Sequence, residues 1–445
     1  MMEIKSEIIS RQAIKPSIPT PPELKTFKLS LLDQISPSFH GNMTFFYPAS
    51  NVTTIVSVAD DFSEKSKRLQ ESISKTLSLF YPLAGRLQDS ATIDCNDDGA
   101  FFVESKVNIQ LSKFLTQPDF NLIMDHFMTT SELSTGAMFI VRFTSFTCGG
   151  VAMSLSTNHK LTDLAALVTL LRSWTSVSRG LSDDPVTITP DFMGEKFLAP
   201  RDELSATSAS LNISSEKFVL NRFVFSASKI EELKAQVEQE FQKQMQSYPS
   251  RVEVVLALLW KCAVVTKKQK TGLFTPSVLF QAVNLRKRMS PPLPDTAMGN
   301  FIWPFMVVAW EEKDLELKEM VIRMRKSFNE FNNTKANTFR GAGAPLAMMG
   351  ALKERAEFLK NNRNIDVFKC SSWCKFPLYD TDFGWGKPIW HVSVNKMSSN
   401  TIALADTPSR DGIEALLTLD DEEMALFEQN EELLKYAIIN PSIYA

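Results

Sequence analysis

The four histidines are the side chains of this chain best suited to accept a proton near neutral pH, because an unperturbed imidazole has a pKa of about 6.5. They are His40, His126, His159 and His391. His159 differs from the others in its context, because it follows the apolar run 151–156 and precedes a segment with helical periodicity. A rigid strand that ends in a turn is a common place from which a functional side chain projects. His159 is therefore the candidate general base.

Asp163 lies four residues after His159, a spacing that would place both groups on one face of a helix. Three interpretations of this pair are open from the spacing alone. His159 could be a metal ligand, a packed or capping residue, or a catalytic base. No third or fourth ligand with characteristic spacing lies nearby, so we predict no metal site.

The elements around His159 are predicted from the hydrophobic pattern. Helical spacing of Leu69, Ile73, Leu77 and Phe80 predicts a helix over 61–80, which should end before Pro82. Strand-like runs occur at 101–104, 138–146 and 150–157, and a helical pattern follows at 161–174. His159 is thus predicted to lie in a turn between a strand and a helix.

The second half of the chain repeats this alternation of strands and helices. The pattern predicts strands at 217–225, 277–283, 302–309, 389–396 and 401–405, and helices at 227–243, 251–265 and 421–437, the last of them a single amphipathic terminal helix. Residues 180–215 are rich in Ser, Thr, Asp and Pro without periodicity, which is typical of a crossover. We therefore predict a two-domain α/β protein with an N-terminal domain over 1–190, a crossover over 191–215 and a C-terminal domain over 216–445.

Composition and charge exclude several partners. The 445 residues carry 48 basic and 51 acidic side chains, so the net charge of −3 gives no general attraction to nucleic acid or to an anionic membrane. The longest apolar stretch, 254–265, is interrupted by Lys261 and is too short to span a bilayer. Five scattered cysteines and a polar N-terminus without a signal-like apolar stretch favour a reducing, cytoplasmic location.

Two motifs far apart in the chain, taken together, are more specific than the spacing of His159 and Asp163. The first is His159-Lys-Leu-Thr-Asp163, and the second is Asp382-Phe-Gly-Trp-Gly386. Further matches are Tyr81-Pro-Leu-Ala-Gly-Arg86, Val283-Asn-Leu-Arg286, Gly299-Asn300 and Ser371-Ser-Trp373. In this order the motifs resemble those of the BAHD acyltransferase family of plants, and within it the vinorine synthase-like group.

The resemblance implies a fold and a reaction. The fold would be two similar chloramphenicol-acetyltransferase-like domains, each a mixed sheet with flanking helices, joined by a long crossover loop. The reaction would transfer an acetyl or short branched acyl group from acyl-CoA, a co-substrate and not a permanently bound cofactor, to a small-molecule alcohol. His159 would act as the base in a ternary complex, and Asp382 would also be essential for catalysis. Trp373 and Ser371 would stabilise the negative charge on the thioester oxygen.

Other residues are assigned supporting roles by the same resemblance. Asp163 would pair with Arg286 and lock the histidine loop, and Gly384, Trp385 and Gly386 would form a structural turn. The CoA contacts are expected in the C-terminal domain, at Ser250, Arg286, Arg288, Lys261 and Lys375. The acceptor would be a hydroxyl of a specialised metabolite such as an alkaloid, a terpenoid, a naphthoquinone or an acyl sugar, and the protein is expected to be a monomer.

Two alternatives are open at this point. A carrier-protein condensation enzyme shares the fold and the His-x-x-x-Asp pattern, but it usually has a second histidine before the motif, where this chain has Asn158. A catalytically inactive relative that only binds CoA or a metabolite is suggested by Leu164, because most relatives have glycine after the motif aspartate.

Overall fold

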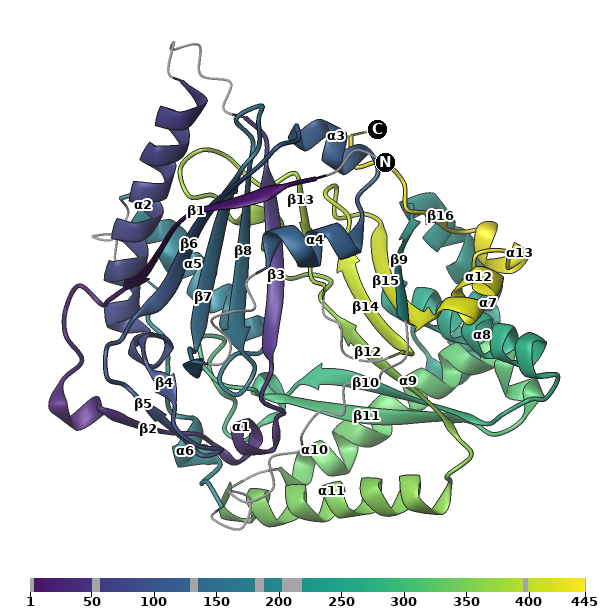
Figure 1. Cartoon of the computed structure of the whole chain (residues 1–445). Coiled ribbons are helices and arrows are strands. Elements are labelled where there is room, and N and C mark those ends of the chain that lie inside the picture. Colours follow the sequence, from purple (N-terminus) through teal and green to yellow (C-terminus); the bar gives the residue numbers. More distant parts are fainter. Residues whose placement is uncertain are drawn as a thin grey trace.

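Two mixed β-sheets lie side by side in the computed structural model, each with helices packed against it (Figure 1). The structure describes residues 4–49, 57–128, 135–180, 188–201, 218–339, 341–394 and 399–444. The two-domain α/β fold with mixed sheets and flanking helices is therefore confirmed. The predicted crossover at 191–215 falls largely on residues outside the described ranges.

The first sheet has six strands, and two of its central strands, Phe139–Ser145 and Val151–Asn158, are buried along nearly their whole length. In spatial order the strands are β1 Ser6–Ile14, β6 Ala100–Val107, β7 Phe139–Ser145, β8 Val151–Asn158, β3 His40–Tyr47 and β13 Trp390–Val392. A small sheet adds β2 Thr26–Lys28, β5 Thr92–Asp94 and β4 Arg86–Leu87. The helices of this half are α1 Leu31–Ile35, α2 Val58–Leu79, α3 Leu111–Thr116, α4 Phe120–Phe127, α5 Leu164–Ser178 and α6 Gly194–Phe197.

The second sheet has seven strands, of which β10, β12 and β14 run parallel to one another. In spatial order the strands are β11 Ile302–Ala309, β10 Ser277–Asn284, β12 Asp366–Ser372, β14 Thr401–Asp406, β15 Ile413–Asp420, β9 Phe218–Phe225 and β16 Ile438–Ile439. Its helices are α7 Ala227–Met245, α8 Arg251–Thr271, α9 Leu317–Asn333, α10 Lys335–Thr338, α11 Ala344–Asn361, α12 Asp421–Phe427 and α13 Glu431–Leu434.

Local capping explains where the helices next to the site begin. Helix α5 starts at Leu164 because the Asp163 side chain accepts a hydrogen bond from the Ala166 amide. Helix α8 starts after Ser250, which forms a capping box with Glu253, and it ends at Gly272 in the left-handed conformation. Both helices pack into cores on the sheets of their own halves.

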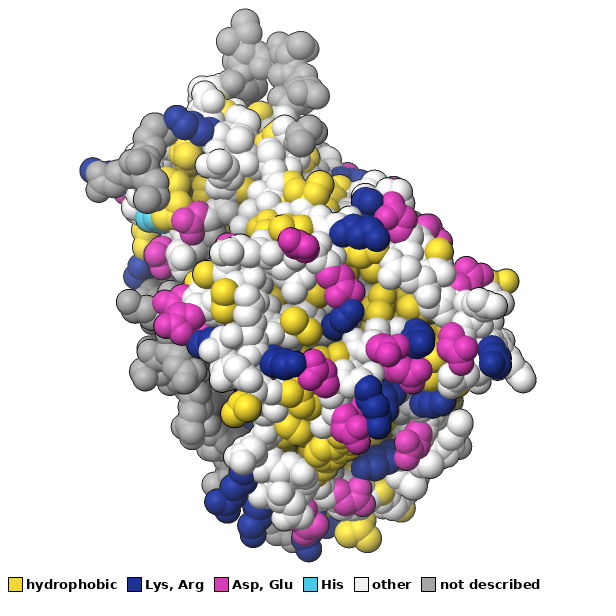
Figure 2. Space-filling model, turned by 90° about the vertical axis from the view of Figure 1, so that its right-hand side faces the viewer, with side chains coloured by type: hydrophobic (Ala, Val, Ile, Leu, Met, Phe, Trp, Pro, Cys, Tyr) yellow, Lys and Arg dark blue, Asp and Glu magenta, His cyan; other side chains and the backbone are white. Residues whose placement is uncertain are grey.

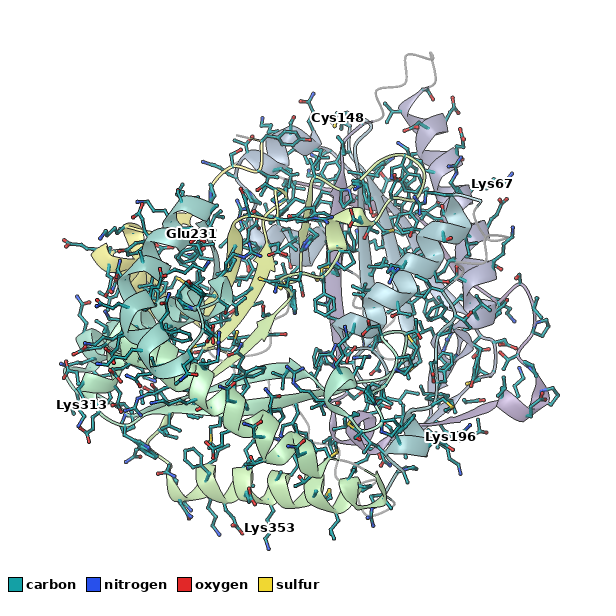
Figure 3. The ribbon with its side chains drawn as sticks, turned by 180° about the vertical axis from the view of Figure 1, so that it is seen from behind. Lys67, Cys148, Lys196, Glu231, Lys313 and Lys353 are labelled. Carbon is teal, nitrogen blue, oxygen red and sulfur yellow. The ribbon has the colours of Figure 1, made fainter. Side chains whose placement is uncertain are left out.

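The outer faces of the helices carry charge, as expected for amphipathic segments on a hydrophobic core. Lys67 on α2, Glu231 on α7 and Lys353 on α11 project outward at the periphery of the ribbon (Figure 3). Side chains of both signs alternate on the face that Figure 2 presents. No helix in the described ranges is long and apolar enough to cross a membrane.

Two predicted elements differ from the structure. The strand expected at 389–396 is Trp390–Val392, and it pairs with β3 in the first sheet although it comes from the second half of the chain. The single terminal helix expected at 421–437 is two short helices, because the chain turns between them and Asn430 caps the second. Residues 395 and 396 lie outside the described ranges.

The Asp382–Gly386 segment also crosses between the halves. Phe383 packs edge-on against Trp174 of α5, with ring centroids 4.8 Å apart, and its carbonyl accepts a hydrogen bond from Ser178. The motif therefore packs into the core of the first half, although it comes from the second half of the chain. The second half of the chain reaches over α5 and fixes the helix that follows His159.

Candidate active site

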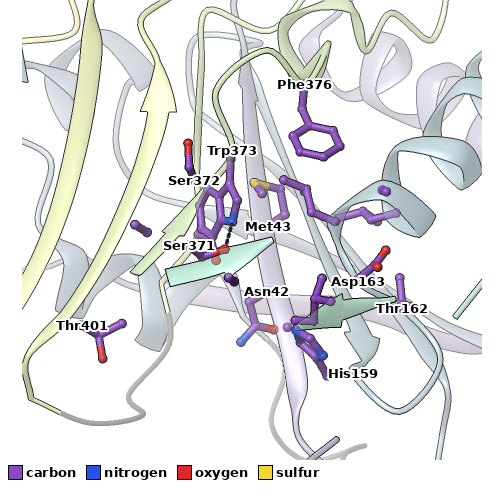
Figure 4. Close-up of a pocket in the computed structure, with 18 of the residues that line it drawn as sticks. Asn42, Met43, His159, Thr162, Asp163, Ser371, Ser372, Trp373, Phe376 and Thr401 are labelled. Atoms are coloured by element: carbon purple, nitrogen blue, oxygen red, sulfur yellow. Dashed lines mark hydrogen bonds between the residues drawn. The ribbon is translucent and has the colours of Figure 1, made fainter. Parts of the chain in front are cut away.

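A cavity of about 280 Å³ lies where the two sheets meet, and both halves of the chain line it. From the first half come β3, the end of β8 and the start of α5, and from the second half come β10, β12, β14 and β15. Figure 4 shows His159 on one side of the cavity and Ser371 and Trp373 on the other. The predicted base and the predicted thioester contacts, 212 or more residues apart in sequence, thus share one cavity.

His159 is held in place on several sides. Its backbone amide donates to the carbonyl of Phe39 at 2.8 Å, and the Phe39 ring lies against the imidazole with centroids 4.6 Å apart. Nδ1 lies 2.8 Å from the side-chain nitrogen of Asn300. Nδ1 faces Asn300, so Nε2 is the ring nitrogen left for a substrate.

Burial sets the protonation state of His159. Removing the imidazole from water disfavours its charged form and lowers the pKa of His159 below its ordinary value of 6.5. The charge of Asp163 and a contact with the His159 carbonyl oppose this shift only in part. The ring is therefore neutral at pH 7, which is the form a general base requires.

Asp163 forms a buried ion pair with Arg286 from the second half. The two bonds are 2.7 Å and 3.0 Å long, and the side chains are only 2% and 1% exposed. The carboxylate also accepts from the Phe301 amide at 3.0 Å. With its lone pairs used in this way, Asp163 is a structural link and not a partner in proton transfer.

Ser371 and Trp373 are coupled to each other. The indole Nε1 donates to Ser371 Oγ at 3.1 Å, as the dashed line in Figure 4 marks. Because the indole N–H is used, it is the Ser371 hydroxyl hydrogen that can be donated into the cavity. The two predicted thioester contacts therefore act as a chain, with Trp373 orienting Ser371.

Asp382 is placed away from the cavity, so its importance for catalysis stays a prediction and would act through the shape of the cavity. Its Oδ1 accepts from the backbone amides of Gly384 and Gly386 at 2.8 Å and 3.0 Å, and the residue does not belong to the cavity lining. Both glycines have φ near +108°, which L side chains rarely adopt. Trp385 packs on Phe383 and Tyr47, so the whole motif is a tight turn that supports α5.

The predicted CoA contacts lie outside the cavity lining. Arg286 cannot contact a CoA phosphate, because it is fully buried and its N–H groups are directed to Asp163, Asn284 and the carbonyls of Ala297 and Gly299. This prediction was wrong.

The other four predicted CoA contacts have protein partners but stay predictions. Lys261 pairs with Glu432, and Arg288 bonds Asn332 and the Asn284 carbonyl. Ser250 caps α8, and Lys375 donates its backbone amide to Asp406.

Sequence reasoning missed Asn300 as a site residue. The dipeptide Gly299-Asn300 was only one of several matching motifs, and nothing in the local pattern shows that its carboxamide reaches His159, 141 residues away. Within the described part of the chain, no group of three or more His, Cys, Asp or Glu residues could hold a metal ion.

A family model described as the Transferase family matches residues 4–434. The chain is 36% identical to akuammiline synthase 1 of Alstonia scholaris, over 96% of this chain and 97% of that protein. It is 32% identical to stemmadenine O-acetyltransferase of Catharanthus roseus, again over 96% and 97%. The crystal structure of vinorine synthase superposes with a TM-score of 0.82 at 30% identity, and covers 99% of this chain and 100% of its own.

These matches define an enzyme that transfers acyl groups. The chain belongs to the Transferase family, the BAHD acyltransferases, and its relatives are of the vinorine synthase-like kind. A TRI101 structure of F. graminearum, complexed with coenzyme A and deoxynivalenol, has a TM-score of 0.65 at 16% identity and shares the fold.

Proposed function

We propose that this enzyme transfers an acetyl or short branched acyl group from acyl-CoA to a hydroxyl of a neutral, largely apolar specialised metabolite, with His159 as the general base. The observation that carries the proposal is the buried, neutral imidazole, with Nδ1 facing Asn300 and Nε2 left for the substrate, across the cavity from the Ser371 hydroxyl.

The steps follow from this arrangement. His159 Nε2 takes the proton of the acceptor hydroxyl as its oxygen attacks the thioester carbon. Ser371 donates to the oxygen on which negative charge develops, and Trp373 holds the serine in place. The carbon–sulfur bond then breaks, and the imidazolium returns its proton to the CoA sulfur. The acyl group passes directly to the acceptor, without a covalent enzyme intermediate.

The charge of the cavity supports uncharged substrates. Among the described residues of the lining, the charged side chain is Asp163, and Arg286 neutralises it. A relative that is 34% identical, the N-malonyltransferase of Strychnos nux-vomica, is named for a malonyl group. In this cavity a malonyl carboxylate would lose its hydration without gaining a cation. An uncharged acyl group loses much less on entry.

The lining also favours an apolar acceptor. Phe39, Met43 and Leu167 from the first half and Phe376 from the second contribute apolar surface to the cavity. A polycyclic or terpenoid skeleton with one free hydroxyl would match this surface, because apolar burial supplies the affinity and the hydroxyl meets His159. An alkaloid acceptor would bind in its uncharged amine form.

The test measures CoA thiol release and product mass with the purified full chain. Acetyl-CoA, isobutyryl-CoA and malonyl-CoA are each offered with alkaloid, terpenoid, naphthoquinone and acyl-sugar alcohols. We expect an acylated product with the first two donors, and a loss of at least about 10²-fold in rate in His159→Gln. Equal rates for His159→Gln and the wild type would exclude the general-base role.

A catalytically inactive binding protein is the remaining alternative, because Leu164 replaces the usual glycine. It would show acyl-CoA binding by calorimetry without thiol release from any donor and acceptor pair. Leu164 is compatible with activity, since it is the first residue of a regularly capped helix and leaves His159 in the cavity.

A further inference from the structure

Helix α1 lies at the junction of the two halves, although it belongs to the first forty residues. Leu31 and Leu32 are buried in the core of the second half, next to Leu198. On its polar side, α1 presents Asp33 and Ser36 to the segment that contains Asn300. The helix therefore contacts the core of the second half. It also contacts Asn300, the residue that lies next to Nδ1 of His159.

Asp33 uses its two oxygens for two different purposes. Oδ2 accepts from the backbone amide and the hydroxyl of Ser30, which closes the capping box of α1. Oδ1 accepts from the backbone amide of Asn300 at 2.6 Å. The carboxylate is 2% exposed, and burial raises its pKa to about 6. A buried carboxylate is costly, and the capping box alone does not need one, because Ser30 is the cap residue and an uncharged Gln can serve at the third helical position.

Asn300 is held at both ends by the same helix. Its backbone amide binds Asp33, and its side-chain nitrogen donates to Ser36 Oγ at 2.6 Å. The same nitrogen lies 2.8 Å from the carbonyl oxygen of His159 and 2.8 Å from Nδ1 of its ring. Helix α1 thus fixes Asn300, and Asn300 contacts both the backbone and the ring of His159.

We propose that Asp33 is a positioning residue for the acyl transfer: by holding the Asn300 backbone against helix α1, it sets the orientation and the tautomer of His159. The inference rests on the proposed function, because the tautomer matters only if His159 is the base. It extends the site to a residue that touches neither substrate nor the reacting atoms.

Hydrogen counting limits the tautomers that this arrangement allows, and our proposal takes the one that leaves Nε2 unprotonated. An amide nitrogen has two hydrogens, so Asn300 can serve only two of the three acceptors around it. If they go to Ser36 Oγ and the His159 carbonyl, Nδ1 carries its own proton and directs it to that carbonyl. Nε2 is then unprotonated and can act as the base. Displacement of Asn300 would remove this selection.

The tautomer can be measured without knowledge of the acceptor. The full chain is labelled with ¹⁵N-histidine, and His159→Gln assigns the His159 signals among the four histidines. We expect the wild type to show a protonated Nδ1 and an unprotonated Nε2 near pH 7.5, well above the ordinary histidine pKa of about 6.5. In folded Asp33→Ala and Asn300→Ala, the two ¹⁵N shifts should move toward each other, which indicates mixed tautomers.

Ser30→Ala is the matched control. It removes the hydroxyl that caps α1 but keeps the bond from Asp33 Oδ1 to the Asn300 amide. It should lower the thermal midpoint and leave the wild-type ¹⁵N shifts unchanged. A tautomer change in Ser30→Ala equal to that in Asp33→Ala would assign the effect to helix capping and overturn the proposal.

The remaining outcomes separate this inference from the proposed function. Wild-type ¹⁵N shifts retained in Asp33→Ala, or mixed tautomers already present in the wild type, would overturn the positioning role whatever the activity. If Asp33→Ala does not fold, Asn300→Ala with wild-type shifts overturns it equally. With an active acceptor, Asp33→Ala should lower kcat about tenfold, with the KM for acetyl-CoA within about a factor of two. Absence of thiol release in the wild type would refute the proposed function alone.

Discussion

The reactivity of His159 depends on its burial as much as on its position. Its pKa lies below 6.5, so the base is already unprotonated under mildly acidic conditions. We expect the acid limb of kcat/KM to fall below pH 6.5, with activity nearly constant from about pH 7 to about pH 8. A profile measured with a subsaturating acceptor and saturating acyl-CoA checks this. An acid limb centred above pH 6.5 would show that the imidazole is stabilised as a cation and contradict the burial argument.

The Ser371 hydroxyl and the Trp373 indole form one unit in our description, so their substitutions should not be additive. Ser371→Ala should lower kcat about 10²-fold, and Trp373→Phe, which only frees the serine to rotate, should lower it about tenfold. The double variant should be no worse than Ser371→Ala. Ser372→Ala, which lines the same cavity, is the control. Additive losses would assign the two residues independent roles.

The sequence allowed part of this site to be predicted. His159, Ser371, Trp373 and the pairing of Asp163 with Arg286 followed from motifs that can be read in short segments. The role of Asp33 did not, because its contact with Asn300 joins residues 267 positions apart through a backbone amide. Such a bond leaves no pattern in side-chain type or spacing.

At the scale of single elements, helix α5 shows why a residue other than glycine is tolerated at position 164. Leu164 is the first residue of the α-helix and is not among the residues with a positive φ, so its position needs no glycine. Leu164 instead occupies cavity volume. We expect Leu164→Gly to destabilise the helix by about 1 kcal/mol and to shift acceptor preference toward bulkier alcohols. Competition between a small and a large alcohol measures the shift, and unchanged preference would show that Leu164 does not contact the acceptor.

Strand β13 couples the two sheets through Trp390. The indole stacks on Phe46, donates to Glu414 at 3.0 Å and lies under the Arg222 guanidinium. Trp390→Ala should cost about 3–5 kcal/mol of unfolding free energy. Trp390→Phe should cost about 1–3 kcal/mol, because Glu414 Oε2 loses its donor while Oε1 keeps the ion pair with Arg222. Urea unfolding tests both. Trp310→Phe, at a side chain 46% exposed, should change little, and a similar loss there would show that the effect is not specific to β13.

The pattern of apolar residues predicted most helices and central strands, because burial on one face imposes a period. It could not predict the partner of a strand. The three residues of β13 look the same in sequence whether they pair with the second sheet or, as they do, with β3. The prediction of a single terminal helix was wrong for a related reason, because the helical spacing of apolar residues continues across the turn before Asn430.

At the scale of the whole molecule, segments from each half are built into the other. Strand β13 and the Asp382–Gly386 turn join the first half, whereas Leu31 and Leu32 of α1 are buried in the second. The cavity lies between these exchanges, so its walls keep their spacing only while both halves are docked. A division of the sequence at 191–215 follows the order of the chain, and it cannot show that segments of each half pack in the other.

The Asp163–Arg286 pair is a buried link between the halves, four residues after His159, and its loss should affect stability and activity together. Asp163→Asn keeps a capping side chain for α5 but leaves Arg286 charged and unpaired, which should cost about 3–5 kcal/mol. Arg286→Gln in the same chain removes the unpaired charge, so the double variant should be more stable than Asp163→Asn, yet still slow, because the histidine turn has lost its anchor. Urea unfolding and kcat measure the two effects separately.

Lys229→Ala, in an exposed pair with Glu232, is the control and should change stability by less than about 1 kcal/mol. If the double variant recovered full activity, the pair would contribute to stability alone, and the position of His159 would not depend on this link between the halves.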